Sequence, residues 1–342
     1  MNTITIKDIA RICGVGVSTV SRALNNHPDI NPETREMILE TVKEYNFVPN
    51  NSARNLKITD SKTIAILVKG ISNPFFMKMI KVMEDEIQKQ KFSLVLHHVD
   101  ADADEVEIAT ELIKEKRLRG IIFLGGHFTH TKEELDRIDV PFVLSTITMA
   151  NGLINNYSFI SVNDIEESYK IVDYLCKLGH KKIATITADE NDESIGRLRK
   201  QGYIKALTDN KITPDDKLIY SMDESIDEYT MENGYAVMKK MLADKVDFTA
   251  VYAISDTLAI GAARALSEAG FRIPEDVSLA GFDGIDYSFF HTPSITTIQQ
   301  PFEEMAIETV NALFNEIDCE GTHLQKLVSG ELIIGGSTAP SS

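Results

Sequence analysis

A short stretch near the N-terminus carries side chains suited to hydrogen bonding with nucleic acid. Residues 17–25 contain serine, threonine, arginine and asparagine, and no aspartate or glutamate. Small hydroxyl and amide groups and a forked guanidinium match the hydrogen-bonding edges of base pairs in a DNA major groove. The polar positions are Ser18, Thr19, Ser21, Arg22 and Asn25. This chemistry favours a DNA-binding surface, with an ordinary small helical hairpin as the alternative.

The residues around this stretch predict two short helices joined by a tight turn. Thr5 stands three residues before Asp8, the spacing of a capping box. Gly14 is a natural end for the first helix, and the second helix is expected to start near Val17. The apolar positions expected to be buried are Ile6, Ile9, Ala10, Cys13, Val20, Ala23 and Leu24.

A third helix and a polar segment complete the N-terminal part. Asn31 and Pro32 form a cap followed by a proline, which is a helix start. The expected apolar positions of this helix are Met37, Ile38, Thr41, Val42 and Tyr45. Pro49 ends the helix, and residues 47–62 are mostly polar. This segment is either a plain linker or a hinge that becomes helical only when DNA or a partner covers it.

Charge is distributed unevenly along the 342 residues. The net charge is −17, which argues against a protein that binds nucleic acid over its whole surface. Residues 1–58 hold seven Lys or Arg and six Asp or Glu, a net charge of +1, so the remaining residues carry −18. The three cysteines are far apart, and no apolar run is long enough to span a membrane. We therefore expect a reduced, cytoplasmic protein with a DNA-contacting head on an acidic body.

The remainder of the chain predicts an α/β body built from doubly wound parallel sheets. Short continuous apolar runs alternate with amphipathic helical stretches, a pattern typical of parallel strands buried on both faces. The expected strands are 63–68, 92–98, 120–125, 141–146, 182–187, 249–254 and 277–282. The number of such units exceeds what one open sheet usually holds, so two lobes are expected. Ligands bind beyond the carboxyl ends of parallel strands, so the cleft between the lobes is the expected site.

Motifs for catalysis or metal binding do not stand out. The sequence lacks a nucleophile elbow, a phosphate-binding loop and a dinucleotide fingerprint. His97 and His98 have no further ligand at metal-binding spacing, and the acidic stretch 189–193 is expected to be a solvated loop. We expect no enzyme, no cofactor and no metal site.

The whole chain resembles the lactose-repressor/galactose-repressor family of bacterial transcription regulators. The motifs that carry the resemblance are TIKDIAR, STVSRALN, PETRE, YNFVPNNSARNLK, ISNPFF, GRLRKQGY, AISDTLAIGAARAL, AGFDG and TTIQQP. The resemblance implies a helix–turn–helix head at 1–48, a hinge helix or linker at 49–61 and a two-lobed body at 62–342 similar to periplasmic sugar-binding proteins. It implies crossovers near 160–163, 290–294 and 320–324. The N-lobe would be about 62–160 plus 293–320, and the C-lobe about 161–292 plus 321–338.

The resemblance also implies roles for residues of the head. Val17, Ser18 and Arg22 match positions that meet base edges in the major groove. Phosphate contacts, which set register rather than sequence, are implied for Thr5, Thr19, Ser21, Asn25 and Thr34. Leu56 matches a leucine wedge that opens the minor groove, and Asn50, Ala53 and Lys57 accompany it in the hinge.

In the body, the resemblance implies an effector site formed by six residues. Phe75 matches an aromatic that stacks on the ligand, Arg199 an arginine that binds ligand hydroxyls, and Asp283 a carboxylate that accepts from them. The full expected set is Asn73, Phe75, Thr146, Arg199, Ser255 and Asp283. No site is assigned within 220–230.

Three positions depart from the family pattern. Gly16 stands where a serine commonly caps the recognition helix, so a weaker cap is expected. Thr146 replaces a frequent aspartate and Ser255 a frequent asparagine. Both belong to the cleft, so the effector can differ from familiar ones.

The sequence therefore predicts a repressor of transcription that binds a pseudo-palindromic operator as a homodimer, with a tetramer also possible. A small molecule, expected to be a sugar or sugar derivative, would bind between the lobes and control operator affinity. Repressor versus activator, and inducer versus corepressor, stay open. The rival classes are a carbohydrate-binding protein without gene control, which would have no helix–turn–helix head, and a doubly wound enzyme.

Overall fold

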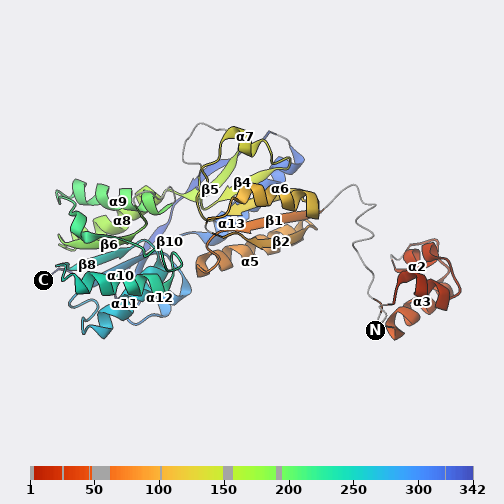
Figure 1. The fold of residues 1–342 in the computed structure, drawn as a ribbon, viewed down its shortest axis with the longest axis horizontal. Coiled ribbons are helices and arrows are strands. Elements are labelled where there is room, and N and C mark those ends of the chain that lie inside the picture. Colours follow the sequence, from red (N-terminus) through yellow and green to blue (C-terminus); the bar gives the residue numbers. More distant parts are fainter. Residues whose placement is uncertain are drawn as a thin grey trace. The chain divides into compact units, whose positions relative to one another are not determined.

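The structure, a computed structural model, describes residues 4–24, 27–45, 47, 62–100, 102–148, 157–189, 195–319 and 321–341. The chain divides into two compact units, residues 1–61 and 62–342 (Figure 1). We describe each unit by itself. The expected residues Asn25, Asn50, Ala53, Leu56 and Lys57 lie outside the described ranges.

The described residues of the N-terminal unit form three helices around a small apolar core. They are α1 (Ile6–Ile12), α2 (Val17–Leu24) and α3 (Pro32–Glu44). Ile9, Val20 and Ile38 are fully buried at the centre, one from each helix. The expectation that Met37 and Tyr45 are buried was wrong, because their side chains are 40% and 44% exposed. A core of this size buries only one or two residues of each helix and leaves the flanking positions in solvent.

Local hydrogen bonds explain where the helices of this unit begin and end. The Asp8 carboxylate accepts from the backbone N–H of Thr5 at 3.0 Å and from its hydroxyl at 2.6 Å. Gly14 follows α1 with a φ of 64°, a left-handed conformation that glycine adopts without strain. The Asn31 side chain accepts from the Glu33 amide at 2.8 Å and caps α3.

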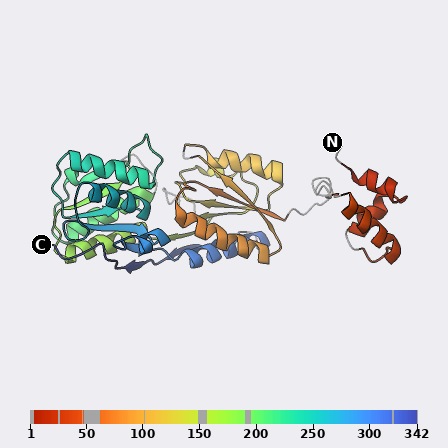
Figure 2. The ribbon, with the colours of Figure 1, turned by 90° about the horizontal axis from the view of Figure 1, so that it is seen from below.

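The described residues of the body form two six-stranded sheets, one in each lobe (Figures 1 and 2). The first sheet is entirely parallel, in the order β11-β5-β4-β3-β1-β2. Its strands are β1 (Thr63–Val68), β2 (Ser93–His98), β3 (Gly120–Leu124), β4 (Phe142–Ser145), β5 (Ser158–Val162) and β11 (Gln325–Val328). Helices α5 (Pro74–Lys89) and α13 (Phe302–Asp318) pack together on one face. Helices α6 (Glu105–Lys116) and α7 (Lys132–Leu135) supply a separate apolar cluster on the other face.

The second sheet has the order β12-β10-β9-β8-β6-β7 and is parallel except for β12, which pairs antiparallel with β10. The strands are β6 (Ile183–Thr187), β7 (Ile219–Ser221), β8 (Ala250–Ala253), β9 (Ser278–Asp283), β10 (Thr296–Gln299) and β12 (Glu331–Ile333). Helices α8 (Asp164–Lys177) and α9 (Ile195–Asp209) form one layer, and α10 (Met231–Ala243) and α11 (Asp256–Glu268) form the other (Figure 1). Short elements η1 (Asp216–Leu218) and α12 (Asp286–Phe290) precede β7 and follow β9.

Strand pairing moves two of the expected lobe boundaries. Strand β10 pairs with β9 in the second sheet, although 293–320 was expected in the N-lobe. Strand β11 pairs with β5 in the first sheet, although 321–338 was expected in the C-lobe. The chain therefore crosses between the sheets at 163, after Gln299, and between β11 and β12. Short strands of mixed polarity give no sequence signal for the sheet that they join.

Burial also corrects one expected strand. The run 92–98 was expected to be buried on both faces, but β2 lies at the edge of the first sheet and Leu96 is 42% exposed.

None of the helices within the described ranges is both long and apolar enough to cross a membrane.

Candidate functional site

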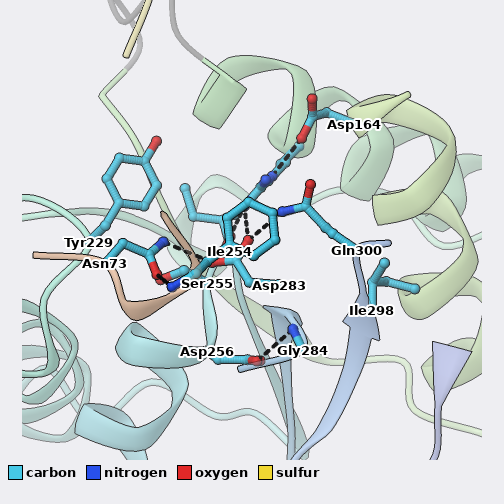
Figure 3. A network of polar contacts seen from close by, with 12 residues as sticks. Asn73, Asp164, Tyr229, Ile254, Ser255, Asp256, Asp283, Gly284, Ile298 and Gln300 are labelled. Carbon is cyan, nitrogen blue, oxygen red and sulfur yellow. Dashed lines mark hydrogen bonds and ion pairs between the residues drawn. The ribbon is translucent and has the colours of Figure 1, made fainter. Parts of the chain in front are cut away.

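A buried polar network joins the two lobes at the carboxyl ends of their strands (Figure 3). Arg199 lies on α9, Asp283 ends β9 in the C-lobe, and Asn73 caps α5 in the N-lobe. All three side chains are at least nine-tenths buried. Residues distant in sequence meet here because parallel strands end at one edge of each sheet.

Arg199 is the centre of this network. Its Nε donates to Asp164 Oδ1 at 2.8 Å, and one terminal nitrogen donates to the Ile254 carbonyl at 2.6 Å and to Asp283 Oδ1 at 3.3 Å. The guanidinium plane lies over the Phe282 ring, with 3.7 Å between Cζ and the ring centroid. The cation is thus held by a carboxylate on each side and an aromatic face below it.

Asp283 connects Arg199 to the other lobe. Its Oδ2 accepts from Asn73 Nδ2 at 3.0 Å, and its Oδ1 accepts from Gln300 Nε2 at 2.8 Å. Asn73 uses its side-chain oxygen to accept from the Phe75 amide at 3.0 Å, so the amide group is oriented by helix α5. Gln300 lies in the segment that crosses from β10 to α13. One carboxylate therefore contacts the N-lobe, the C-lobe and the connection between them.

Ser255 and Tyr229 lie beside this network (Figure 3). Ser255 is fully buried and caps α11 by accepting from the Leu258 amide at 3.3 Å. Its hydroxyl is 2.9 Å from that of Thr257, which donates to the Tyr229 carbonyl at 2.5 Å. Tyr229 was not expected from the sequence, because residues 220–230 carried no motif.

Phe75 and Thr146 come from the same edge of the first sheet. Phe75 is 3% exposed and packs against Phe76, with 5.7 Å between the ring centroids. Thr146 follows β4 with a φ of 68°, and its buried Oγ1 has no hydrogen-bond partner among the described residues. No hydrogen bond within the described ranges joins Thr146 to Arg199 or Asp283. The structure thus brings three of the six expected residues into direct contact, with Ser255 and Phe75 adjoining them in the chain segments of that network.

Burial and charge set the protonation of the network. Burial alone would lower the pKa of Arg199, but Asp164 and Asp283 raise it overall and keep the guanidinium charged. Burial raises the pKa of Asp283, and the contacts with Arg199, Asn73 and Gln300 partly offset that rise. One buried cation is therefore shared by two buried carboxyl groups, which leaves acceptor capacity for hydroxyl donors.

The helix α2 presents the polar face expected for DNA contact. Val17, Ser18 and Arg22 are exposed, and Val17 is an exposed apolar side chain at 42%. Thr5 is exposed, while Thr19, Ser21 and Thr34 are partly buried. The Gly16 carbonyl accepts from the amides of Thr19 and Val20 at 2.9 and 3.2 Å, so α2 begins without a side-chain cap at this glycine.

The described ranges contain no group of three or more His, Cys, Asp or Glu side chains placed to hold a metal ion. Cys13, Cys176 and Cys319 are free thiols; Cys176 is half-buried, and burial raises its pKa to about 11.

Comparison with known proteins places this geometry in a family. The pattern described as "Bacterial regulatory proteins, lacI family" matches residues 5–50, and "Periplasmic binding protein-like domain" matches residues 172–338. The chain is 40% identical to the HTH-type transcriptional regulator MalR of Clostridium butyricum over 331 residues, 96% of this chain and 97% of that one. It is 32% identical to the HTH-type transcriptional repressor PurR of Pasteurella multocida, over 92% of each chain.

The chain belongs to the LacI family.

Two solved structures of transcription regulators share the fold along nearly the whole chain. A complex of the transcriptional regulator CelR with cellobiose has a TM-score of 0.71 and 27% identity, and the match covers 98% of this chain and 99% of that one. A lac repressor dimer bound to operator and an anti-inducer has a TM-score of 0.77 at 24% identity, covering 99% and 100%. The latter likeness concerns the fold alone. The expected fold class and family are confirmed, and the chain is a DNA-binding transcription regulator with a helix–turn–helix head.

The structure adds residues that sequence reasoning missed. Asp164 and Gln300 are hydrogen-bonded members of the network, and Phe282 stacks beneath the guanidinium. Gln300 lies within the motif TTIQQP and Phe282 within AGFDG, so both were near a visible signal. Asp164 and Tyr229 had no motif that pointed to them.

Proposed function

We propose that this LacI-family protein represses transcription and releases its operator when a neutral carbohydrate binds between the lobes. The observation that carries the proposal is the interlobe network of Arg199, Asp283 and Asn73. A ligand that hydrogen-bonds to this network contacts both lobes at once. Its binding energy therefore depends on how the lobes are arranged, which is the condition for an effector to shift a conformational equilibrium.

The charge of the network favours a neutral, hydroxyl-rich effector over a phosphorylated one. Arg199 is paired with two carboxyl groups, and Asp256 lies behind Asp283 in the same lobe. A phosphate group would find no cation in this network that is not already paired with a carboxyl group, whereas sugar hydroxyls can donate to the carboxyl oxygens. The cellobiose in the related CelR structure agrees with this class. The effector would contact Asn73, Phe75, Thr146, Arg199, Ser255 and Asp283.

In the head, we infer that Val17, Ser18 and Arg22 read base edges. These side chains project from α2 into solvent, and residues 17–24 include no carboxylate that would repel phosphate. Thr5, Thr19, Ser21, Asn25 and Thr34 would contact phosphates. Asn50, Ala53, Leu56 and Lys57 would act in the hinge, with Leu56 inserted into the minor groove. Because the target is bacterial DNA, the protein would act in the cytoplasm.

A homodimer is the proposed functional state. Exposed apolar side chains gather where the two lobes meet: Met77 on α5 is 52% exposed, and Tyr287 and Phe290 on α12 are 57% and 88% exposed. The Lys78–Asp286 ion pair places these two helices beside each other. A second copy would cover this patch and the edge strand β2. Its two heads could then bind the two halves of a palindromic operator.

Fluorescence anisotropy tests the proposal. Palindromic DNA selected from a random pool by the wild-type protein serves as the operator, and maltose, cellobiose and ribose serve as effectors. Operator binding should weaken steeply as salt rises, because phosphate contacts release counterions. A sugar that binds should weaken operator affinity, and operator should weaken the sugar by the same factor. Identical sugar affinity with and without operator would contradict the coupling; failure to select any DNA would contradict the regulator itself.

An activator is the second candidate within this family. It would use the same operator contacts as a repressor. The direction in which transcription changes separates the two candidates. Transcription from a promoter that carries the selected operator should fall when a repressor is added and recover with sugar.

A further inference from the structure

Asp256 is a buried carboxylate that the effector site leaves unexplained. It is the first residue of α11 and is fully buried. Its Oδ2 accepts from the backbone amide of Gly284 at 2.8 Å (Figure 3). The same oxygen accepts from the Ile285 amide at 2.9 Å and from the Ser288 hydroxyl at 2.5 Å. Its Oδ1 accepts from the Thr297 hydroxyl at 2.6 Å. Four donors from three chain segments satisfy this carboxylate, so it has no need of a ligand.

The segment that Asp256 holds contains the effector-binding carboxylate. Asp283 has a φ of 114°, a conformation that an L side chain rarely adopts, and Gly284 follows with a φ of 72°. A side chain at Gly284 would meet the Gln299 Cα at 2.6 Å, so only glycine fits against β10 here. A turn of this kind is held by its surroundings rather than by its own preference. The two amides bound by Asp256 come directly after Asp283.

The same contacts fix the start of α12, which reaches the other lobe. Asp286 follows the two bound amides, and its Oδ1 is 2.5 Å from Lys78 Nζ on α5. Lys78 Nζ also lies 5.1 Å from the centroid of the Phe302 ring at the start of α13. The Asp283–Asn73 hydrogen bond and the Asp286–Lys78 ion pair are therefore both made from the segment that Asp256 anchors.

We propose that Asp256 is a positioning residue for effector recognition. It holds the Gly284 and Ile285 amides so that Asp283 points at Arg199 and Asn73 and Asp286 points at Lys78. Asp256 itself does not touch the effector, because its acceptor positions are occupied by the chain. This role rests on the proposed function only in taking Asp283 as part of the sugar site.

The proposal distinguishes hydrogen-bond geometry from charge. In Asp256→Asn, the side-chain oxygen can still accept from both amides, and the new NH2 can donate to the Thr297 hydroxyl. The Thr297 hydroxyl can then donate to the Ile298 carbonyl, 3.4 Å away. In Asp256→Ala, the buried amides lose their acceptor, which is unfavourable enough to displace the turn. Asparagine should therefore preserve effector binding and alanine should not.

The matched control is Asp276→Ala. Asp276 also accepts from a backbone amide and an arginine in the C-lobe, at 2.8 Å from Arg272 N, but it lies on the surface away from Asp283. Its loss should not change sugar affinity if the effect at Asp256 is specific to the turn.

The experiment uses the full-length protein with maltose, cellobiose and ribose in isothermal titration calorimetry. For whichever of these binds the wild type, Asp256→Ala should weaken affinity roughly tenfold or more, and Asp256→Asn and Asp276→Ala should stay within about threefold. Operator affinity without sugar should be unchanged in the control Asp276→Ala. Equal losses for Asp256→Asn and Asp256→Ala, or wild-type affinity in Asp256→Ala, would overturn the proposal.

Hydrogen–deuterium exchange gives an answer that does not depend on a folded alanine variant or on sugar. In the wild type and in Asp256→Asn, the Gly284 and Ile285 amides should exchange far more slowly than the amide of the exposed Phe290. Fast exchange at both amides in the wild type would refute their anchoring. If none of the three sugars binds the wild type, the carbohydrate proposal fails, while slow exchange at these amides still supports the positioning role of Asp256.

Discussion

Lys78 on α5 and Asp286 on α12 form an ion pair between the two lobes, with 2.5 Å between Nζ and Oδ1. Asp286 belongs to α12, the helix that carries the exposed Tyr287 and Phe290, and Lys78 is 28% exposed and Asp286 63%. The buried Asn73–Asp283 hydrogen bond also joins the lobes, so the ion pair is the more exposed of these two contacts. Any movement that separates the lobes must break both contacts.

Removal of the outer contact should weaken effector binding slightly. We expect Lys78→Met to lower sugar affinity about two- to fivefold, because a partly exposed ion pair contributes little energy and is screened by salt. The control is Lys81→Met, since Lys81 pairs with Asp85 within the same helix at 2.7 Å and makes no interlobe contact. The difference in sugar affinity between the two variants should shrink at about 0.5 M salt, where screening is stronger. Equal sugar affinity for both variants would argue against an interlobe role for Lys78.

The buried cation should matter much more for stability. Arg199→Met leaves Asp164 and Asp283 buried together without their cation, so we expect the free energy of unfolding to fall by about 3–5 kcal/mol. Urea unfolding followed by circular dichroism measures this change. Arg264→Met is the matched control, because Arg264 pairs with Glu268 on an exposed helix face at 3.0 Å. A loss in Arg199→Met no larger than in the control would show that the network does not stabilise the C-lobe.

Substitution of serine for each of two glycines should change the stability of the head in opposite directions. A Cβ at Gly16 would lie 3.5 Å from Ser18 Oγ, an ordinary contact, so Gly16→Ser can supply the missing cap and stabilise the head by a few tenths of a kcal/mol, on the order of 0.3. Gly14→Ser places a side chain at a φ of 64° and should destabilise it by about 1–2 kcal/mol. Hydrogen exchange of the α1 and α2 amides in the full-length protein reports both effects. Slower exchange in Gly14→Ser than in Gly16→Ser would contradict the turn geometry.

The hinge leucine should contribute to specificity rather than to general affinity. We expect Leu56→Ala to weaken binding to the selected palindrome by more than about tenfold. Binding to random DNA should weaken by less than about twofold, because only a specific site is kinked by an apolar wedge. Anisotropy with both duplexes at matched salt measures the difference. Arg22→Ala is a comparison from the base-reading helix. Equal losses on specific and random DNA for Leu56→Ala would exclude a wedge.

Lowering the pH should destabilise the contact between His180 and the C-terminal segment of the chain at Ala339. Burial lowers the pKa of His180, although the Ala339 carbonyl that accepts from its ring opposes the shift. The folded-state pKa is therefore below the unfolded value of 6.5, so the contribution of neutral His180 is fully present above 6.5 and is lost as the pH falls below it. Urea midpoints between about pH 5 and 8 should fall less steeply toward acid in His180→Gln than in the wild type. His98→Gln, at an exposed histidine of β2, serves as the control; identical pH profiles for His180→Gln and the wild type would refute the assignment.

The amino-acid sequence alone determined the local structure of this protein. The seven long apolar runs all became strands, since a short unbroken apolar run such as 63–68 suits a parallel strand that is buried on both faces. Capping signals such as Thr5 with Asp8, and Asn31 before Pro32, placed helix starts because they act within one turn. The motifs also identified the family, and with it the expected roles of Arg199 and Asp283.

The sequence did not predict the strands that are short or that mix apolar and polar residues. Strands β5, β7, β10, β11 and β12 have three to five residues each and include threonine, serine, glutamine or glutamate. Such segments become strands because a neighbouring strand supplies hydrogen bonds, and the sequence does not say which neighbour that is. The assignment of β10 to the second sheet and β11 to the first was consequently a tertiary outcome.

The site was decided in the same way. Asp283 and Asn73 are 210 residues apart, and Asp283 and Arg199 are 84 apart, so no local rule could pair them. Asp164, Gln300 and Tyr229 joined the site because strand ends and crossovers converge on one edge of each sheet. Sequence supplied the chemical groups, whereas the tertiary structure decided which donor faces which acceptor, because that depends on distances between segments that only the packed sheets fix.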